Sequence, residues 1–506
     1  MQDLRGLGQW PKLTTQWFRA RGTQRGLPTL IVGAGTAART LTRDLRRTSS
    51  YGLRPIGCLD DNPYARPVLG LPILGRLADL GQVVTERRID VVVIAIPSLP
   101  AVEVRALARE AAATGARVRY LPSFLAAVEN VARASDLRML QLGALLGREE
   151  RQLEQPLARA ALHGKRVLIT GAGGSIGSEL CRQVRSYGPQ SLYMLDHDES
   201  NLHRLQLELD GEALLDSNEV IIADIRDEGR IRQVFRSLRP EIVFHAAAHK
   251  HLPLLERHPC EGVKSNVLGT QHLVQAALEQ NTERFVLIST DKAADPRSIL
   301  GATKRLAEMV VQANAIGQTS FCSVRFGNVL GSRGSFLTVL IEQIEHGDPV
   351  TVTHPDVTRF FMTVEEAVGL VLAAAPMAEY GETFVLDMGE PVRIVDLVQN
   401  YAEQLQVPDV KIRYTGLRPG EKLHECLFSE AEERLPTAHP AIWATRGSRV
   451  PDSFAAHLDK LYAAAADDDA PLVRELLEEL LPEYVGTAAD PRELTAALSA
   501  PYPDGF

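Results

Sequence analysis

The sequence predicts an α/β protein built from two Rossmann-like, doubly wound parallel-sheet domains. Apolar runs typical of buried strands alternate with helical patterns along most of the chain. Two of these runs, TLIVGAG and VLITGAGGSIG, lead directly into glycine-rich turns. With 506 residues, of which 45% are hydrophobic, the chain is long enough to build more than one core.

We divide the chain into five segments from these patterns. They are a leader at 1–26, a Rossmann-like nucleotide-binding-type domain at 27–125, a helical linker at 126–163, a larger dinucleotide-binding domain with a smaller substrate lobe at 164–450, and a helical tail at 451–506. The leader contains Trp10 and Trp17 without clear periodicity, and we interpret it as loosely ordered.

The N-terminal domain shows a complete small α/β unit. Its strands are TLIVGAG, a run that ends in IGCLDD, and VVVIAIP, with a helical pattern after the first. Gly33, Gly35 and Ala38 match G-x-G-x-x-A, and Asp60 closes the next strand. This pattern permits nucleotide binding, but the domain shows no acid, base and nucleophile together. A structural or regulatory role therefore stays open beside it.

The larger domain repeats the alternation on a bigger scale. The linker before it contains GREERQLEQPLARAAL, which is typical of an amphipathic helix. After about Thr351 prolines separate short elements, as expected of a lobe that covers the substrate. The expected strands are VLITG, SLYMLD, EVIIAD, IVFHAAA, FVLIST, FCSVRFGNVL and ETFVLDMG.

The glycine turn after the first strand of this domain predicts a dinucleotide site. Gly171, Gly174 and Gly177 allow a tight turn, close approach of a pyrophosphate and close helix packing, and Ser175 and Ile176 lie between them at the helix start. Asp196 ends the next strand, where a carboxylate would hold the ribose hydroxyls. An acid at this place favours NAD over NADP.

Further candidates follow the later strands. Ligands of an open α/β sheet gather at the carboxyl ends of its strands. We expect the cofactor to contact Asp224 and Ile225 after EVIIA, and the small residues Ala246, Ala247 and Ala248 after IVFH.

A hydroxyl, a carboxylate and an amine emerge together from the strand FVLIS. Thr290, Asp291 and Lys292 follow Ser289 there, and Lys304 lies in the next helix. These groups are what proton-shuttling chemistry requires. We therefore expect the catalytic residues here, with Lys304 also at the cofactor.

Several ordered motifs of this chain resemble one family. The glycine turn, STDKAADP, GATKRLAE, RFGNVLGSRGS, HPDVTRFFMT and LRPGEKLHE are similar to those of the polysaccharide-biosynthesis nucleotide-sugar 4,6-dehydratases, in the extended short-chain dehydrogenase superfamily. The resemblance covers about Gly164 to Trp443. It implies conversion of UDP-N-acetylglucosamine to a 4-keto-6-deoxy sugar with tightly held NAD, for polysaccharide or glycan biosynthesis.

Two features depart from the superfamily. Leu300 stands where the pattern Y-x-x-x-K has its tyrosine, and a leucine accepts no proton. Long members of the family resemble this chain in carrying an apolar residue there. Those members usually begin with several membrane helices, which this sequence does not show, so we expect a soluble homologue or a truncated start.

The resemblance also implies roles for single residues. Thr290 would orient the C4 hydroxyl, a neutral Lys292 would remove the C5 proton, a protonated Asp291 would donate to the leaving C6 hydroxyl, and Lys304 would hold the nicotinamide ribose. We assign the substrate to His249, Lys250, Asn328, Arg333, Arg359, Arg418 and Glu421, because guanidinium groups suit a diphosphate.

Alternative functions stay open at this point. The nearest enzymes are a nucleotide-sugar epimerase and a C5-inverting dehydratase. The alternative outside enzymes is a regulatory module that senses NAD or a nucleotide, although such a sensor has no use for the Thr290 to Lys292 cluster.

Composition excludes several classes of function. A net charge of -9 argues against a general nucleic-acid binder. The five cysteines form no C-x-x-C pair, and the histidines of HAAAHKHLPLLERH lack a carboxylate or thiolate set, so we predict neither a disulfide framework nor a metal. No run is long enough for a spanning helix. We expect a cytoplasmic homo-oligomer and leave peripheral association with the inner face of the membrane open.

Overall fold

The computed structural model divides the chain into two compact units, Met1–Gln141 and Leu142–Phe506. The predicted leader lies outside the described residues except for Gly26, and the end of the tail, 485–506, also lies outside them. The structure describes residues 26–484 except for 48–52, 63–65, 97–106, 108–109, 112–113, 121–137, 140–155, 212–216, 316, 331, 333–335, 337–338, 341–342, 344–347, 380, 405–409 and 446–449.

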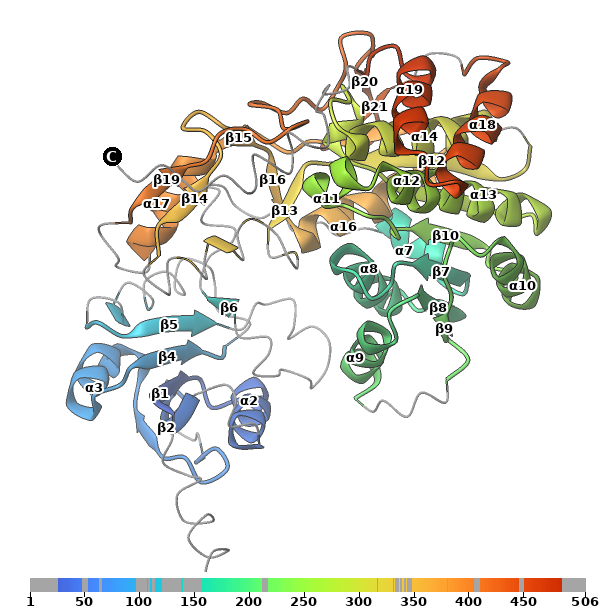
Figure 1. Cartoon of the computed structure of the whole chain (residues 1–506). Coiled ribbons are helices and arrows are strands. Elements are labelled where there is room, and N and C mark those ends of the chain that lie inside the picture. Colours follow the sequence, from blue (N-terminus) through green and yellow to red (C-terminus); the bar gives the residue numbers. More distant parts are fainter. Residues whose placement is uncertain are drawn as a thin grey trace, which may run out of the picture. The chain divides into compact units, whose positions relative to one another are not determined.

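The first unit is a six-stranded sheet with helices on both faces (Figure 1). All neighbouring strands are parallel except the last pair, β5 and β6. One face packs under α2 (Thr36–Arg47) and the other under α3 (Leu80–Arg87) with the short η2 (Leu77–Asp79). In sheet order the strands are β3 (Ile73–Gly75), β2 (Leu53–Leu59), β1 (Leu27–Val32), β4 (Val91–Ile94), β5 (Arg117–Tyr120) and β6 (Arg138–Met139).

The glycine turn of this unit closes on the acid at the end of β2. Gly33 has a φ of +106°, and a Cβ there would lie 2.6 Å from the Ile96 side chain. The backbone N–H of Ala34 donates to Asp60 Oδ2 at 2.6 Å. The turn therefore has the backbone that the motif predicts, while the ligand of this domain stays a prediction.

The segment predicted as a helical linker has two described elements. One is the strand β6, which the linker prediction did not include, and the other is the helix α7 (Pro156–Leu162). Ala158 and Leu162 of α7 are buried in the core of the second unit.

The second unit is built on a nine-stranded sheet. Its first seven strands along the chain are all parallel, as predicted, and the edge strands β21 and β20 are antiparallel additions. In sheet order the strands are β20 (Leu435–Pro436), β21 (Ile442–Thr445), β17 (Thr383–Leu386), β12 (Ser320–Arg325), β11 (Arg284–Ile288), β10 (Ile242–His245), β7 (Arg166–Thr170), β8 (Ser191–Asp196) and β9 (Val220–Ile222).

Helices cover both faces of this sheet because successive side chains of a strand point to opposite sides. In β7, Leu168 packs into one core and Val167 and Ile169 into the other. The prediction of two Rossmann-like α/β domains is confirmed. The helices are α8 (Ser175–Ser186), α9 (Glu199–Asp210), α10 (Glu228–Leu238), α11 (Leu252–Arg257), α12 (Pro259–Gly262), the π-helix η4 (Val263–Leu268), α13 (Gly269–Glu279), η5 (Asp291–Ala293), α14 (Ile299–Ala313), α16 (Val364–Ala374) and η6 (Ala375–Met377).

The predicted tail begins with two helices that belong to the core of this unit. They are α18 (Phe454–Ala466) and α19 (Ala470–Leu480), which lie beside α12 and α14 in Figure 1. Phe454, Leu461 and Leu477 are buried in the same cluster as the side chains of α14. Removing these helices would expose that apolar face.

Short strand pairs form the smaller lobe after β12. β13 (Asn328–Leu330) pairs with β16 (Phe361–Thr363), β14 (Val350–Val352) with β19 (Ile412–Tyr414), and β15 (Thr358–Arg359) with β18 (Val392–Arg393). The helix α17 (Ile394–Gln404) completes the lobe. Because β13 directly follows β12, the lobe starts at the carboxyl end of the large sheet.

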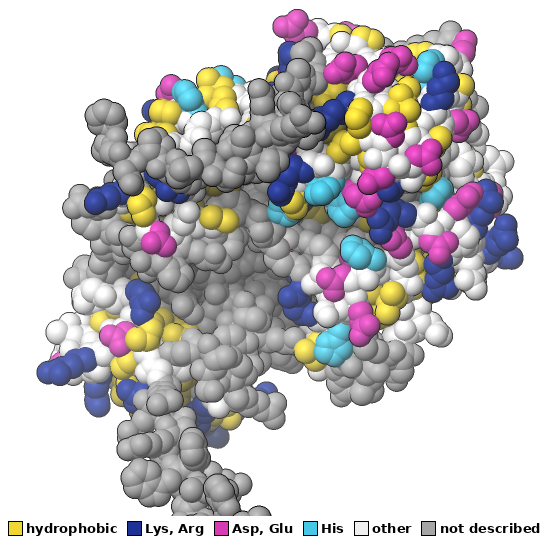
Figure 2. Space-filling model, in the orientation of Figure 1, with side chains coloured by type: hydrophobic (Ala, Val, Ile, Leu, Met, Phe, Trp, Pro, Cys, Tyr) yellow, Lys and Arg dark blue, Asp and Glu magenta, His cyan; other side chains and the backbone are white. Residues whose placement is uncertain are grey.

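The surface shows no block of one charge on the face seen in Figure 2, where acidic and basic side chains alternate over the described part of the second unit. Of the helices in the described part of the chain, none is long and apolar enough to span a bilayer.

Candidate active site

The glycine turn between β7 and α8 forms the floor of a pocket. Gly171 has a φ of +67°, and a Cβ there would lie 2.6 Å from the backbone nitrogen of Ala247. A Cβ on Gly177 would lie 2.0 Å from the carbonyl oxygen of Gly171. Only glycine fits at either place, so the turn can press against the end of β10 and expose the N-terminus of α8.

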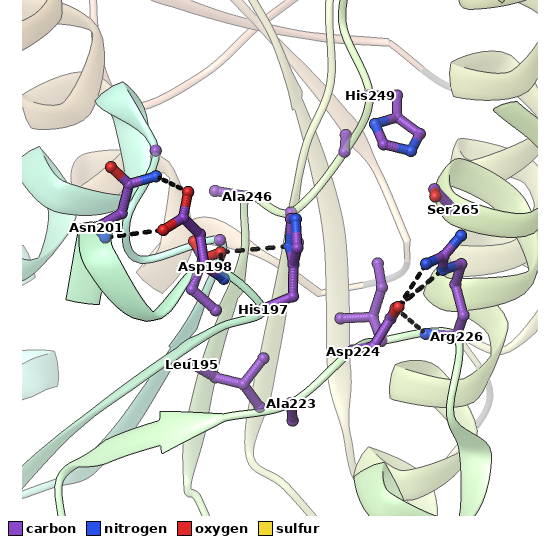
Figure 3. Close-up of a pocket in the computed structure, with 16 residues that line it drawn as sticks. Leu195, His197, Asp198, Asn201, Ala223, Asp224, Arg226, Ala246, His249 and Ser265 are labelled. Atoms are coloured by element: carbon purple, nitrogen blue, oxygen red, sulfur yellow. Dashed lines mark hydrogen bonds and ion pairs between the residues drawn. The ribbon is translucent and has the colours of Figure 1, made fainter. Parts of the chain in front are cut away.

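The pocket holds about 230 Å³ and lies at the carboxyl ends of β7, β8, β9 and β10 (Figure 3). It contains most of the residues that the sequence assigned to the cofactor. Ser175, Ile176, Gly177 and Lys304 are the predicted cofactor residues outside its lining. The lining is Gly171, Gly174, Leu195, Asp196, His197, Asp198, Asn201, Ala223, Asp224, Ile225, Arg226, Ala246, Ala247, Ala248, His249 and Ser265.

Asp196 holds two backbone groups beside the turn. Its carboxylate accepts from the N–H of Gly173 at 2.8 Å and from that of Asp198 at 3.0 Å, and the side chain is buried. Asp198 caps α9 by accepting from Asn201. These bonds fix the Asp196 carboxylate at the pocket, as the recognition of a ribose diol requires.

Arg226 is a residue of the pocket that the sequence analysis did not select. Its guanidinium donates to Asp224 at 2.6 and 2.9 Å and to Glu261 at 3.0 Å. The hydrogen bond from Arg226 lowers the pKa of Asp224. Figure 3 shows Arg226 turned toward Asp224, so the Asp224 carboxylate, which the sequence assigned to the cofactor, already has a partner in this structure.

Lys304 lies under the sheet end, not in the pocket. Its ammonium donates to the carbonyl of Ile288 at 2.6 Å, and burial lowers its pKa to about 8. Leu300, one turn earlier, is 6% exposed and packs in the hydrophobic core. Leu300 therefore fills space where a catalytic tyrosine stands in the wider superfamily.

The predicted catalytic residues follow β11 as one turn. Thr290 is the N-cap of η5 and accepts from the Lys292 N–H, while its hydroxyl donates to Asp291 Oδ1 at 2.9 Å. The Lys292 ammonium donates to the same Oδ1 at 3.0 Å and to Asn328 Oδ1 at 3.4 Å. Asp291 is fully buried, and its Oδ2 has no hydrogen-bond partner in the described part of the chain.

The surroundings of Lys292 favour its charged form, whereas the resemblance implied a neutral amine. Burial alone would lower the pKa of Lys292, but the attraction of Asp291 and Glu425 outweighs it and raises the pKa above its ordinary value. The sequence shows Asp291 beside Lys292, but it does not show that Glu425 joins them in the fold.

The smaller lobe brings more charge to this turn. Arg359 at the end of β15 is 7% exposed and donates to Glu421 at 2.9 Å. Glu421 also accepts from Thr353 at 2.9 Å and from the backbone of Arg418, whose side chain is exposed. Arg359 and Glu421 therefore bind each other, whereas the sequence assigned both to the substrate.

Two of the remaining predicted substrate residues, His249 and Lys250, follow β10. His249 lines the cofactor pocket, where its backbone N–H donates to Asn266 at 2.8 Å. Lys250 is exposed beside it. Arg333 lies outside the described residues. Within the described ranges no group of three or more side chains is suited to hold a metal ion.

Glu425 lies near the turn of Thr290, Asp291 and Lys292, and it was not among the residues predicted from the sequence. Its neighbour His424 pairs with Thr358, so the chain brings Glu425 next to Arg359. Glu425 Oε1 lies 3.8 Å from Lys292 Nζ and 4.0 Å from Arg359 Nε. The motif LRPGEKLHE contained the only signal for it, a second acid after Glu421.

Comparison with known proteins gives two family matches. A model described as polysaccharide biosynthesis protein matches residues 167–446, and one described as CoA-binding domain matches residues 10–122.

Curated relatives and a solved structure extend the match. The probable polysaccharide biosynthesis protein EpsC of Bacillus subtilis strain 168 is 39% identical over 464 residues, which are 90% of this chain and 74% of that protein. The capsular polysaccharide biosynthesis protein CapD of Staphylococcus aureus is 40% identical over 80% of this chain and 69% of its own. The UDP-N-acetylglucosamine 4,6-dehydratase (inverting) of Campylobacter jejuni is 34% identical over 54% of this chain and 80% of its own. The X-ray structure of Pen from Bacillus thuringiensis covers 57% of this chain and 89% of its own, at 33% identity and a TM-score of 0.53.

Proposed function

Because the chain belongs to the polysaccharide biosynthesis protein family, we propose that it is an NAD-dependent lyase that acts on nucleotide sugars. The reaction we propose is 4,6-dehydration of UDP-N-acetylglucosamine to a UDP-4-keto-6-deoxy-N-acetylhexosamine. The observation that carries the proposal is the hydrogen-bonded pair of Asp291 and Lys292 at the carboxyl end of β11.

The pocket of the glycine turn suits the adenosine and pyrophosphate part of NAD. Gly171, Gly174 and the alanines after β10 leave room beside the N-terminus of α8, where a pyrophosphate would lie. Asp196 would hold the adenosine ribose. NAD bound there would take a hydride from the sugar and return it, so no external reductant is consumed.

The pair of Asp291 and Lys292 supports the elimination of water. Its 3.0 Å hydrogen bond allows the Nζ–H bond to break as an Oδ–H bond forms, which converts the ion pair into a neutral amine and a neutral acid. The amine can then accept the C5 proton of a 4-keto sugar, and the acid can donate to the C6 hydroxyl as it leaves. After these two transfers Lys292 is again an ammonium and Asp291 again a carboxylate, so the pair can exchange a proton in the next cycle.

Neighbouring residues would orient the sugar. Thr290 is half-buried and adjacent to Asp291, so its hydroxyl can position the C4 hydroxyl. Asn328 holds Lys292 from the other side through its side-chain oxygen. Arg359 would contact the diphosphate once Glu421 releases it.

Substitution of Asp291 tests this assignment. Asp291→Asn keeps the size of the side chain but cannot take the proton from Lys292. We expect dehydration to fall by about a hundredfold or more, while binding of NAD, measured by calorimetry, stays within about twofold. Turnover near the wild-type rate would remove Asp291 from the mechanism.

Epimerisation is the second candidate, since an epimerase of this fold also moves a hydride at C4. The buried carboxylate and amine favour dehydration, because loss of the C6 hydroxyl needs a proton donor and removal of the C5 hydrogen needs a base.

A further inference from the structure

Glu425 is a buried carboxylate among three cations, and each of these cations lies closer to another carboxylate. Its side chain is 3% exposed. Oε1 lies 3.8 Å from Lys292 and 4.0 Å from Arg359, and Oε2 lies 4.0 Å from Lys422. Oε2 has no hydrogen-bond partner among the described residues.

Each of the three cations has a closer carboxylate. Asp291 lies 3.0 Å from Lys292, Glu421 lies 2.9 Å from Arg359, and Asp295 lies 3.0 Å from Lys422. Asp295 is also paired with the exposed Arg297 at 3.5 Å, so four carboxylates and four cations share the cluster. Glu425 is the carboxylate of this cluster with no cation closer than 3.8 Å. Two uncharged groups lie near these cations, namely the Asn328 amide, 3.4 Å from Lys292, and the Cys426 thiol, 3.9 Å from Lys422.

A buried carboxylate without a close cation takes up a proton more easily than its neighbours. Burial raises the pKa of Glu425, and the negative charge of Asp291 adds to this, against the attraction of Lys292, Arg359 and Lys422. The other carboxylates of the cluster each accept a direct hydrogen bond or ion pair at 3.0 Å or less.

We propose that Glu425 is a positioning residue that sets the charge of Lys292. As a carboxylate it keeps the Lys292 ammonium charged through their 3.8 Å approach. When Glu425 binds a proton, that attraction ends, and Lys292 passes its own proton to Asp291 along their hydrogen bond. In that transfer one N–H bond breaks and one O–H bond forms, and no electrons leave the pair.

This inference rests on the proposed function only for its catalytic consequence. The coupling of the two charges exists whether or not the protein turns over a sugar. A measurement of Lys292 alone therefore tests it.

The experiment is competitive acetylation of the full chain with acetic anhydride between pH 6 and pH 11. Mass spectrometry of the peptide that contains Lys292 gives the pH at which half of this amine reacts. We compare the wild type with Glu425→Gln, which removes the charge, and with Glu425→Asp, which keeps it. Glu433→Gln, an exposed glutamate of the same lobe, is the matched control.

We expect the midpoint for Lys292 to fall by about one to three pH units in Glu425→Gln, where the upper value is the attraction of unit charges 3.8 Å apart at an effective dielectric of about 20. Glu425→Asp should move it less, and Glu433→Gln should leave it unchanged. If Glu425→Gln does not fold, a smaller fall in Glu425→Asp supports the proposal. A midpoint that is the same in all folded variants overturns it.

The rate of dehydration separates this inference from the proposed function. If both hold, the pH profile of turnover moves in the same direction as the labelling midpoint. If the Lys292 labelling midpoint moves but neither the wild type nor any variant dehydrates a UDP-sugar, the charge coupling stands and the proposed reaction fails.

Discussion

Arg325 offers the sharpest test of what holds the carboxyl ends of β11 and β12 together. This side chain is fully buried at the end of β12. It donates two hydrogen bonds to Glu308, at 2.7 and 2.6 Å, and a third to Glu432 at 2.7 Å. Glu308 in turn accepts from Ser289 at 2.6 Å, the residue before Thr290. One guanidinium thus joins β12, α14, β11 and the smaller lobe.

Substitution Arg325→Leu should destabilise the second unit strongly. It leaves two carboxylates, on side chains that are 2% and 4% exposed, without their main partner. Breaking a buried ion pair from one side costs about 3–5 kcal/mol, because the remaining charge stays buried. The contact of Glu308 with Arg305 at 3.3 Å offsets only part of this cost.

Urea unfolding of the ligand-free protein, followed by circular dichroism, measures the change. The matched control is Arg236→Leu, because Arg236 is 65% exposed and lies 3.8 Å from Glu279, so its loss should cost no more than about 1 kcal/mol. A loss below about 1 kcal/mol for Arg325→Leu would refute the reasoning.

Three further predictions concern the cofactor pocket and the group beneath it. Asp196→Asn should weaken NAD binding about tenfold or more by calorimetry, because the ribose loses a charged acceptor; unchanged affinity would contradict the assignment. Gly177→Ala should destabilise the protein by about 2 kcal/mol or more in thermal melts, since its Cβ would overlap the turn. The control Gly229→Ala in α10 should be neutral or stabilising by up to about 1 kcal/mol. Equal effects would exclude steric overlap as the cause. The pKa of Lys304 is about 8 in the fold and 10.5 in the unfolded chain, so the unfolded state binds more protons between these values. The stability of the ligand-free wild type relative to Lys304→Met should therefore rise by about 2 kcal/mol from pH 8 to pH 10 in melts, and a difference that stays constant with pH would contradict this.

The strands and the glycine turns could be predicted from the sequence for a physical reason. Parallel strands covered on both faces are continuous apolar runs, and β7 and β11 are such runs. A tight turn against the sheet requires glycine at Gly171 and Gly177, so the motif is visible without a structure.

The edge of the sheet and the packing of the tail could not be predicted in this way. β20 and β21 are short and lack a clear alternation. The pattern of α18 and α19 identifies amphipathic helices, but it does not say which surface they cover.

The charge of Lys292 is the main point that the sequence concealed. Its pKa depends on Glu425, which lies far along the chain and reaches the site only through the smaller lobe. Lys292 directly follows Asp291 in the chain, so this pair is visible in the sequence, but the carboxylate that the fold brings to it is not.

The most direct test of the central claim is incubation of the purified protein with UDP-N-acetylglucosamine without added reductant, followed by proton NMR and mass spectrometry. We expect loss of one water and a new C6 methyl signal, and the coupling at C5 then distinguishes retention from inversion. A product of unchanged mass would show epimerisation and contradict the proposed dehydration. If the protein binds NAD but converts neither this sugar nor other UDP- and dTDP-sugars, the result would contradict the assignment as an enzyme and favour a sensor.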